Sequence, residues 1–392
     1  MTHLADRKLC TGCTSCANSC PNGCITMARD AEGFSFPEID SGSCVDCGAC
    51  RIACPVLHGK EEIRQNTIAY AAHTKNPQIR KESTSGGIFS ELALEILNRG
   101  GAVYGAAYDE NYRVVHQCIE NSEALAALRG AKYSQSELGD CFSDIRKRLQ
   151  NGQKVLFSGT PCQVAGLKAF LKKNDDNLFC VDLVCHGVPS PMVWERYVRY
   201  RAERESDGLM PESVNLRCKD SGWSRYAYSV DFTYSGGVRY LKRNGEDEFM
   251  QMFVGDYVLR ESCGNCPEKG YDRKSDITLG DFWGIWDIDP EMDDNKGTSL
   301  LLTHSEKGEK LLDLIKSRIQ FKKVEAEEAS RMNPAMLKSV THKKERQETL
   351  AAIASGGFQP LDIPDNERTD MKAKIKSKVK SLIRKVSKNQ KQ

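Results

Sequence analysis

The 392-residue sequence has no run approaching the roughly 20 apolar residues that a helix needs to cross a bilayer. Its first residues, MTHLADRKLC, also lack the apolar region of a secretion signal. These absences argue against an integral membrane or secreted protein, and we expect a cytoplasmic one. Hydrophobic residues make up 40% of the chain and charged residues 28%, which is typical of a globular fold with ample core material.

Two nucleotide-related signals are missing as well. No G-x-G-x-x-G follows an expected strand, so a Rossmann-type nicotinamide site is not supported. The formal net charge of the chain is +2. Residues 367–392 contain ten Lys or Arg and two acidic residues, a net charge of +8, so the rest of the chain has a net charge of −6. Because that acidic body has no recognised nucleic-acid motif, nucleic-acid binding is disfavoured.

Cysteine, in contrast, is abundant, with 17 residues. A secreted disulfide framework is the alternative, but the missing signal and the odd count favour ligation of a metal or a cluster. Eight cysteines fall in two similar runs, CTGCTSCANSCP at 10–21 and CVDCGACRIACP at 44–55. The two runs form an internal repeat with a 34-residue period.

Each run has the pattern C-x2-C-x2-C-x3-C-P, in which the fourth cysteine ligates the other cluster of a pair. This segment resembles bacterial-type ferredoxins with two [4Fe-4S] clusters. The predicted ligands are Cys10, Cys13, Cys16 and Cys54 for the first cluster and Cys20, Cys44, Cys47 and Cys50 for the second. Structural zinc is the alternative, although zinc sites favour separated C-x2-C pairs. Cys24 lies outside the pattern, and we expect it to be a small core residue.

The rest of the chain predicts a larger domain of mixed type. A polar stretch after the second run suggests a domain boundary near residue 62. A strand, helix, strand, helix pattern over 153–205 predicts neighbouring parallel strands, with Ser190 as the N-cap of the second helix. A hairpin around 235–237 breaks the parallel pattern, and one further strand and helix over 298–319 close the folded region.

Four later cysteines stand in segments that we expect to be loops. They are Cys162, Cys185, Cys263 and Cys266. The first two follow strands of the parallel pattern, where ligands of such sheets bind, and the last two form a C-x2-C pair. Spacing alone leaves a third [4Fe-4S] cluster and structural zinc both open.

Five motifs of this domain keep a distinctive order. They are STSGG at 83–87, RGAKYSQS at 129–136, VLFSGTPCQVAGL at 155–167, DLVCHGVPSP at 182–191, and CGNC at 263–266 followed by SDITLGDFWG. Together they resemble the beta-subunit family of coenzyme F-420-reducing hydrogenases and formate dehydrogenases, over roughly residues 65–320. Members of that family carry a four-iron cluster beside FAD, so the resemblance implies FAD and a third cluster on the four later cysteines.

The resemblance also completes the predicted architecture. We predict an α+β fold: a small ferredoxin-like domain at 1–62 and a larger mixed α/β flavin and iron–sulfur domain, followed by a helical extension with a basic tail at 321–392. Residues 63–150 and 151–320 would be the N- and C-terminal parts of the larger domain, and the third cluster would lie in the latter.

FAD needs amides or hydroxyls for its pyrophosphate and an apolar or aromatic slot for its ring. The turn at 83–87 opens a predicted helix, whose N-terminus favours anions; an ordinary helix start is the alternative. The predicted flavin-binding residues are Ser83, Thr84, Ser85, Gly86, Gly87, Lys132, Tyr133, Ser136 and Thr160.

His186, beside Cys185, is the candidate proton donor to a substrate, with a hydrogen bond to cluster sulfur as its alternative role. Asp281, Trp283 and Trp286 are candidates to line the flavin pocket, with core packing as the alternative for both tryptophans.

Residues 371–388 place apolar side chains at helical spacing among Lys and Arg. This pattern is typical of helices that bind a membrane surface or a partner, and a solvated tail is the alternative. Membrane contact would put the protein at the inner face of the membrane.

These observations predict a flavin-dependent iron–sulfur oxidoreductase that passes electrons between [4Fe-4S] clusters and FAD and exchanges hydride with a substrate. The expected electron partner is a redox protein or ferredoxin. The substrate would be a deazaflavin like F-420 or, by analogy with bacterial relatives, a lipid-linked precursor of a surface polysaccharide. The alternatives are a non-catalytic electron-transfer subunit and a zinc-stabilised scaffold.

Overall fold

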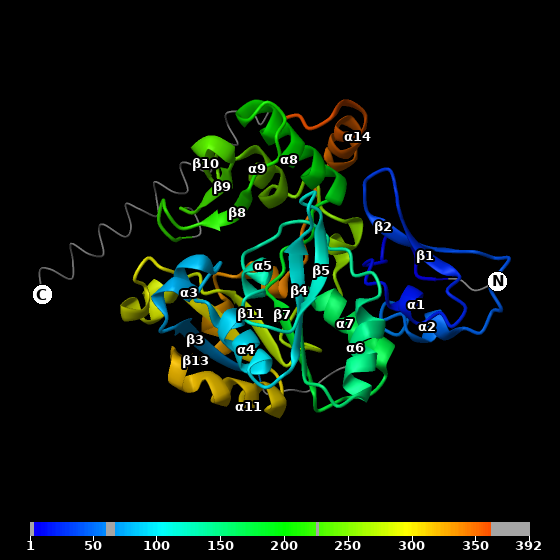
Figure 1. Cartoon of the computed structure of the whole chain (residues 1–392), viewed down its shortest axis with the longest axis horizontal. Helices are drawn as coiled ribbons and strands as arrows, with labels where there is room; N and C mark the ends of the chain where they lie inside the picture. Colours follow the sequence, from blue (N-terminus) through cyan, green and yellow to red (C-terminus); the bar gives the residue numbers. More distant parts are fainter. Residues whose placement is uncertain (1–3, 60–66, 225–226, 362–392) are drawn as a thin grey trace, which may run out of the picture. The chain divides into compact units, whose positions relative to one another are not determined.

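The N-terminal module contains both cysteine runs. The computed structural model describes residues 4–59, 67–224 and 227–361 (Figure 1). The module consists of α1 (Ser15–Asn18), β1 (Ile25–Arg29), β2 (Ser35–Ile39) and α2 (Ala49–Ile52), and β1 pairs antiparallel with β2. Each helix follows a left-handed residue at the equivalent position of its run, Thr14 (φ 61°) or Gly48 (φ 72°). The predicted repeat therefore folds into two similar turns.

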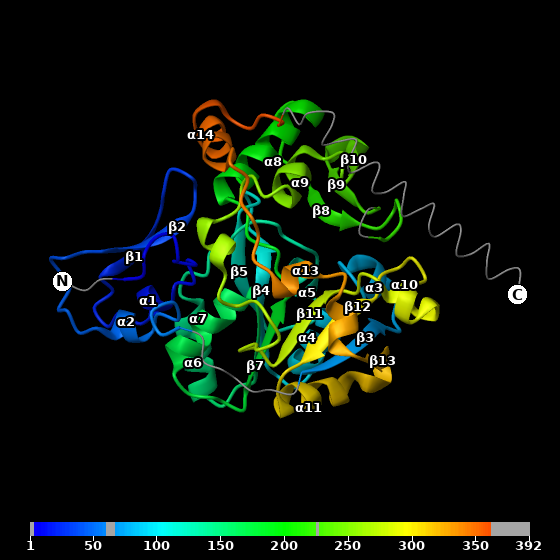
Figure 2. The same ribbon diagram turned by 180° about the vertical axis from the view of Figure 1, so that it is seen from behind.

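An eight-stranded sheet lies at the centre of the rest of the chain (Figure 2). Its strand order is β13-β3-β12-β11-β7-β6-β4-β5. The strands are β3 (Ile68–Thr74), β4 (Ala102–Tyr108), β5 (Val114–Ile119), β6 (Val155–Ser158), β7 (Leu178–Leu183), β11 (Ile277–Asp281), β12 (Ser299–Thr303) and β13 (Ile319–Val324).

Five strands of this sheet share one direction. β4, β6, β7 and β11 pair in parallel, and β3 runs the same way because both β3 and β11 are antiparallel to β12. Their carboxyl ends therefore meet at one edge of the sheet, which we call the carboxyl edge. Ligands of α/β proteins bind at such an edge.

Helices cover both faces of the sheet, because its inner strands are apolar on both sides. On one face, α4 (Ile88–Leu97) and α11 (Glu306–Ile315) pack with Leu156 and its neighbours. On the other, α6 (Cys141–Gln150) and α7 (Pro161–Leu171) pack on Val155 and Phe157. This alternation along β6 is the period-two pattern of a strand buried on both sides.

The second face continues over β12 and β3. There the sheet is covered by α10 (Ile285–Ile288), α12 (Ala326–Ser330) and α13 (Pro334–Leu337). The remaining short elements are α3 (Pro77–Glu82), α5 (Leu125–Leu128), η1 (Ser235–Gly237), η2 (Glu261–Asn265), η3 (Pro290–Met292) and η4 (Lys316–Arg318).

A second, antiparallel sheet has the order β10-β9-β8. It contains β8 (Ser213–Cys218), β9 (Ser229–Thr233) and β10 (Arg239–Arg243), and α8 (Pro191–Glu205), α9 (Glu248–Val254) and α14 (Arg346–Gly356) lie near it (Figure 1). Aromatic rings hold the sheet and helices together, as in the pairs of Trp194 with Phe232 and with Phe249. The hairpin predicted around 235–237 is confirmed as β9 and β10.

Several predicted elements are confirmed and two differ in detail. Ser190 caps α8 by accepting a hydrogen bond from Val193 N. The strand in the predicted 298–319 unit runs antiparallel to both of its neighbours, and β13 extends past residue 320 as an edge strand. The large mixed α/β sheet after a cysteine-rich module is thus as predicted. The basic segment 371–388 lies outside the described residues.

Among the described residues, no helix is both long enough and apolar enough to span a membrane.

Candidate iron–sulfur and flavin site

The first cavity lies in the N-terminal module and is lined by four cysteines from both runs. They are Cys10, Cys13, Cys16 and Cys54. Ser15 Oγ donates a hydrogen bond of 2.7 Å to the Ala53 carbonyl, which joins the two runs beside this cavity. The grouping of three cysteines from one run with the last of the other is the one predicted for the first cluster.

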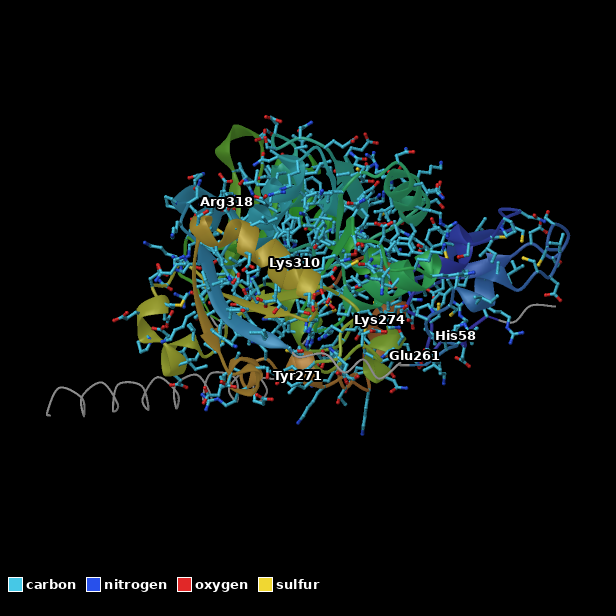
Figure 3. The ribbon with its side chains drawn as sticks, turned by 90° about the horizontal axis from the view of Figure 1, so that it is seen from below. His58, Glu261, Tyr271, Lys274, Lys310 and Arg318 are labelled. Carbon is cyan, nitrogen blue, oxygen red and sulfur yellow. The ribbon has the colours of Figure 1, made fainter. Side chains whose placement is uncertain are left out.

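The second cavity has the corresponding four cysteines with the runs exchanged, and Cys24 in addition. Its cysteines are Cys20, Cys24, Cys44, Cys47 and Cys50. Cys24 is buried, as expected, yet its sulfur lies 3.2 Å from Cys20 Sγ and the residue lines the cavity. Side-chain sulfur atoms (yellow) are visible throughout this module, whose ribbon is blue in Figure 3. Sequence spacing placed Cys24 in the core but gave no sign of its proximity to the predicted ligands.

The donor chemistry of both cavities fits a four-iron core. Burial, together with the charges of Cys10 and Cys54, raises the pKa of Cys13 to about 11. Such thiolates repel one another as bare anions, whereas iron stabilises the thiolate that ligates it. In the described parts of the chain no three His, Cys, Asp or Glu side chains are grouped to hold a single metal ion. The cysteines surround cavities instead, as a cluster requires.

The third cysteine set comes from three segments, two of which follow β6 and β7 at the carboxyl edge, and Cys162 and Cys263 lie in helices where loops were expected. Cys162 is the second residue of α7, Cys185 follows β7, and Cys263 and Cys266 lie in and just after η2. Burial raises the pKa of Cys185 to about 12, with Cys263 and Cys266 adding to the increase. Burial followed by the charge of Cys266 raises the pKa of Cys162 well above its ordinary range. The fold therefore brings together all four cysteines, whose thiolates the iron ions of a cluster would stabilise.

Helix α7 connects the first cavity to the third set. A Cβ added at Gly166 would lie 2.8 Å from Cys13 Cβ and 2.9 Å from its sulfur, so the helix touches the first cavity only because this residue is glycine. Cys162 lies four residues earlier on the same helix, about 6 Å along its axis. The first cavity is thus the one adjacent to the third set, a relation that the sequence did not reveal.

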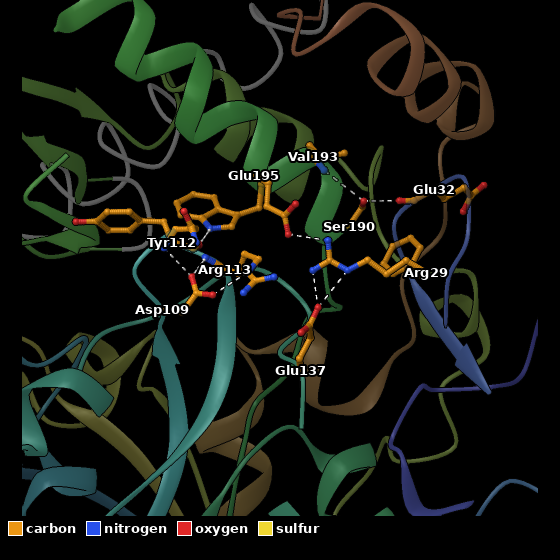
Figure 4. A network of polar contacts seen from close by, with 12 residues as sticks. Arg29, Glu32, Asp109, Tyr112, Arg113, Glu137, Ser190, Val193 and Glu195 are labelled. Atoms are coloured by element: carbon orange, nitrogen blue, oxygen red, sulfur yellow. Dashed lines mark hydrogen bonds and ion pairs between the residues drawn. The ribbon is translucent and has the colours of Figure 1, made fainter. Parts of the chain in front are cut away.

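Polar contacts also hold the N-terminal module against the larger part of the chain. Arg29 of β1 donates to Glu137 at 3.1 Å and to Glu195 of α8 at 2.7 Å (Figure 4). Ser190 Oγ donates to the Glu32 carbonyl, so the cap of α8 is also a contact with the β1–β2 turn. Charge-assisted bonds of this kind fix the orientation of the two parts.

The predicted pyrophosphate turn at 83–87 opens α4 at the carboxyl edge. Gly87 is the N-cap with φ 83°, and a Cβ at Gly86 would lie 2.5 Å from a carbonyl oxygen of β3. The hydroxyls of Ser83 and Ser85 donate to backbone carbonyls, and Thr84 between them is half-buried. The turn is therefore held against the sheet, and its two serine hydroxyls already have protein partners.

Lys132 and Tyr133 lie in the motif at 129–136. Lys132 Nζ donates to two carbonyls of the preceding turn, and burial lowers its pKa to about 7. The Tyr133 ring packs against Phe253 with centroids 4.6 Å apart, and its hydroxyl accepts a 3.2 Å hydrogen bond from Arg217. Tyr133 therefore joins the motif to both the second sheet and α9.

Gln163 joins two predicted flavin residues to the third cysteine set. Its Nε2 donates to Ser136 Oγ at 2.8 Å, and its Oε1 accepts from Thr160 N at 2.9 Å. Thr160 Oγ1 lies 3.2 Å from Cys162 Sγ, and Ser136 Oγ lies 2.9 Å from His116 Nδ1. Ser136 and Thr160 are thus in one polar network with a predicted cluster ligand.

Four buried polar atoms near Tyr133 have no hydrogen-bond partner among the described residues. They are Tyr108 OH, Ser134 Oγ, Arg217 Nε and Asp281 Oδ1. Unsatisfied buried polar groups are costly, so their presence around one ring indicates a place for a polar ligand. This fits a flavin, whose ring edge and phosphates need such partners. Sequence reasoning missed Arg217, because an arginine at the end of a strand belongs to no motif.

Three of the four remaining candidates, His186, Asp281 and Trp283, lie close to Phe253 or Arg217 in the same region. His186 Nε2 lies 2.6 Å from Asp256 Oδ1, and its ring meets Phe253 edge-on. Asp281 Oδ2 accepts a 2.7 Å bond from Arg217. Trp283 stacks on a second tryptophan, Trp223, while Trp286 is half-buried in α10. His186 is therefore held by a carboxylate, and its catalytic role stays a prediction.

Comparisons with known proteins cover most of the chain. Residues 69–142 and 152–329 match the N- and C-terminal models of the coenzyme F-420 hydrogenase/dehydrogenase beta subunit, and residues 9–57 match a 4Fe-4S dicluster domain. The chain is 23% identical over 334 residues to a subunit of the F(420)H(2) dehydrogenase of Methanosarcina mazei, covering 82% of this chain and 86% of that protein.

A second relative is the coenzyme F-420-dependent sulfite reductase of Methanocaldococcus jannaschii. The two are 22% identical over 367 residues, which is 88% of this chain but only 52% of the reductase. Among solved structures, a chain of the F-420-reducing [NiFe] hydrogenase complex of Methanosarcina barkeri matches with a TM-score of 0.47 and 15% identity, covering 70% of this chain and 92% of that one. The chain belongs to the coenzyme F-420 hydrogenase/dehydrogenase beta subunit family and is an iron–sulfur subunit of oxidoreductase type with an N-terminal 4Fe-4S dicluster domain.

Proposed function

We propose that this protein transfers electrons from a redox partner through three [4Fe-4S] clusters, in the order second, first, third, to FAD at the carboxyl edge. The ligands would be the four predicted cysteines of each set. FAD, when bound, would convert one-electron transfers into hydride exchange with a substrate.

The contact between Gly166 and Cys13 carries this proposal. It joins the first cavity to α7, whose second residue is Cys162, and no residue of α7 is among those that line the second cavity in the described parts of the chain. The second cavity suits the partner's side, because Cys47 is exposed and Val45 beside it is 67% exposed. The three sets would therefore form a path from the surface of the module to the sheet.

The residues near Tyr133 would hold the flavin. The hydroxyls of Ser136 and Thr160, close to the third set, would donate hydrogen bonds to the flavin. The unpartnered Nε of Arg217 would donate to the polar edge of the flavin ring or to a phosphate. Lys132, whose pKa is lowered to about 7 by burial, can hold or release a proton there near neutral pH. His186, oriented by Asp256, would hold a proton for the substrate.

The substrate class follows from the relatives. Because the names of both sequence relatives contain F-420, we propose a deazaflavin of that type as the hydride partner. A lipid-linked saccharide is the other substrate considered, and neither relative points to it. Oxidation of the reduced protein by F-420 would favour the deazaflavin, and oxidation only by a lipid-linked saccharide would overturn it.

A non-catalytic relay is the second candidate function. It is favoured by the first relative, which is itself one subunit of a dehydrogenase. A relay exchanges electrons only with a protein, whereas the proposed enzyme also oxidises or reduces a small molecule. Assay of F-420 reduction with artificial one-electron donors therefore separates the two.

Metal and flavin analysis of anaerobically reconstituted protein tests the cofactor content. We expect about twelve irons, at four per cluster, together with FAD released on denaturation. Cys266→Ala should lose about four of these irons, and the matched control Cys118→Ala, a half-buried strand residue outside all three sets, should keep them. Protein that binds zinc and neither iron nor flavin would be the scaffold instead.

A further inference from the structure

Arg260 lies between the first cavity and the third cysteine set. It precedes η2, which carries Cys263, and its side chain is only 1% exposed. Its Nε donates to the Cys10 carbonyl at 2.8 Å, and a second nitrogen donates to the Ser35 carbonyl at 3.1 Å. Both acceptors belong to the N-terminal module, so this arginine of the larger part of the chain reaches to the edge of the first cavity.

The third side of the guanidinium faces the motif at 129–136. Arg260 donates to Gln135 Oε1 at 2.8 Å, and Gln135 Nε2 in turn donates to the Thr11 carbonyl at 3.3 Å. A Cβ at Gly12 would lie 3.0 Å from the same arginine and 2.5 Å from Gln135. The loop of the first cavity is thus packed directly on this pair.

The charge of Arg260 has no carboxylate partner among the described residues. Its hydrogen-bond acceptors are two carbonyls and an amide, and the guanidinium lies 4.2 Å from the centre of the Phe36 ring. A buried cation without an opposite charge is costly. The ionisable groups that act on it are the thiols of Cys10, Cys263 and Cys162, which belong to two different cysteine sets.

We propose that Arg260 is the shared countercharge of the first and third clusters and raises the reduction potential of both relative to the second. The inference rests on the proposed function, because it needs clusters at both sets. Four thiolates make a ligated cluster net negative, and one added electron makes it more so. A fixed positive charge nearby therefore stabilises the reduced form.

The step that Arg260 would assist is a single electron transfer. One electron leaves the first cluster, which is oxidised, and arrives at the third cluster, which is reduced, with no bond broken and no proton moved. The electron comes from a low-potential redox protein docked at the second cavity. Because Arg260 stabilises the reduced form of both clusters, it makes delivery from the second cluster favourable without trapping the electron at the first.

Arg346 provides a matched control. It is also a buried arginine between the same two parts of the chain, since it donates to the Leu259 carbonyl at 2.6 Å and to Glu32 of the β1–β2 turn. Its charge, however, is neutralised by Glu32 at 2.6 Å. Arg346→Gln together with Glu32→Gln therefore removes a contact of the same kind as a neutral pair and leaves no unpaired charge.

The test is a redox titration followed by electron paramagnetic resonance on anaerobically reconstituted protein. Signals are assigned with Cys47→Ala and Cys266→Ala, which remove a ligand of the second and the third set. Arg260→Gln should lower the reduction equilibrium constants of the first and third clusters about tenfold, about 59 mV for a one-electron couple. The double variant Glu32→Gln/Arg346→Gln should leave all three midpoints unchanged, and Arg260→Lys should restore part of the loss.

A second variant keeps the arginine and cancels its charge. Gln135→Glu preserves the acceptor for Arg260 and should lower the same two midpoints, so the test stands even where Arg260→Gln loses iron. Unchanged midpoints, an equal fall at all three clusters, or a fall at only one of the two overturns the proposal. Wild-type protein that lacks iron at the third set contradicts the proposed function instead, and iron analysis reports that separately.

Discussion

The first cavity and the third cysteine set are built in opposite ways. The first takes three of its four cysteines from the stretch 10–16, so a single loop presents them. The third takes its cysteines from residues that follow two different strands, β6 and β7, and from η2 and the residue after it, up to 104 positions apart between Cys162 and Cys266. One site depends on local turns, and the other depends on the whole sheet. Changes in the sheet should therefore affect the third set and spare the first.

The largest expected effect tests the exchange of ligands between the two runs. Cys54→Ala should remove the four irons of the first cluster, although Cys54 lies in the second run, because the first cavity takes its fourth cysteine from there. Reduction of the third cluster by a partner should then stop. Iron analysis and electron paramagnetic resonance measure both effects.

Cys24→Ala is the control for that experiment, since Cys24 lines the second cavity outside the ligand pattern. It should leave the iron content unchanged. Loss of the second cluster in Cys24→Ala would show that Cys24 is a ligand, and loss of the second cluster in Cys54→Ala would show that the exchange is wrong.

A smaller effect is expected where the two parts of the chain touch. Gly166→Ala puts a methyl group within 3 Å of Cys13, and such overpacking costs about 1–3 kcal/mol. We expect lower stability in urea and slower reduction of the third cluster. Gly245→Ala, at a position with nothing within 4 Å, is the matched control. Unchanged stability and transfer in Gly166→Ala would contradict the close approach of α7 to the first cavity.

The smallest expected effect is that of acid, which should destabilise the sheet before it affects the N-terminal module. His304, which bonds to Thr278 in the sheet, is 2% exposed, and burial followed by the charge of Arg273 lowers its pKa to about 3. In the unfolded chain His304 has its ordinary pKa and binds a proton more readily than in the folded protein. The contribution of His304 to the free energy of unfolding is therefore fully present above about pH 6.5 and falls by about 1.4 kcal/mol per pH unit below that pH.

His304→Gln should flatten that pH dependence between pH 6.5 and 5, as measured by urea unfolding at each pH. In the described part of the N-terminal module the histidine is His58, which is exposed. The iron signals of the module should therefore persist at a pH where the sheet is already weakened. An equally steep pH dependence in the variant would assign the acid sensitivity to another group.

The sequence predicted what local spacing encodes. The two cysteine runs, the cap at Ser190 and the hairpin at 235–237 each depend on residues close together in the chain, and the structure has these elements. The direction of β12 was not predictable, because a run of apolar residues has no direction. β13 was missed because its exposed residues 320–323 give an edge strand no apolar alternation.

Long-range contacts were beyond sequence reasoning. Gly166 and Cys13 are 153 positions apart, and Arg260 and Cys10 are 250 apart. No sequence pattern identifies Gly166 or Arg260 as important, because the role of each depends on the residues that the fold places beside it. Glycine in a helix normally reduces stability, so the mid-helix position of Gly166 was the one available signal of a close approach.

The order of the three clusters is the central claim, and the magnetic coupling between reduced clusters tests it most directly. Pulsed electron paramagnetic resonance on fully reduced, reconstituted protein should show strong coupling of the first cluster to both the second and the third, and weak coupling between the second and the third. Stronger coupling of the third cluster to the second than to the first would contradict the account.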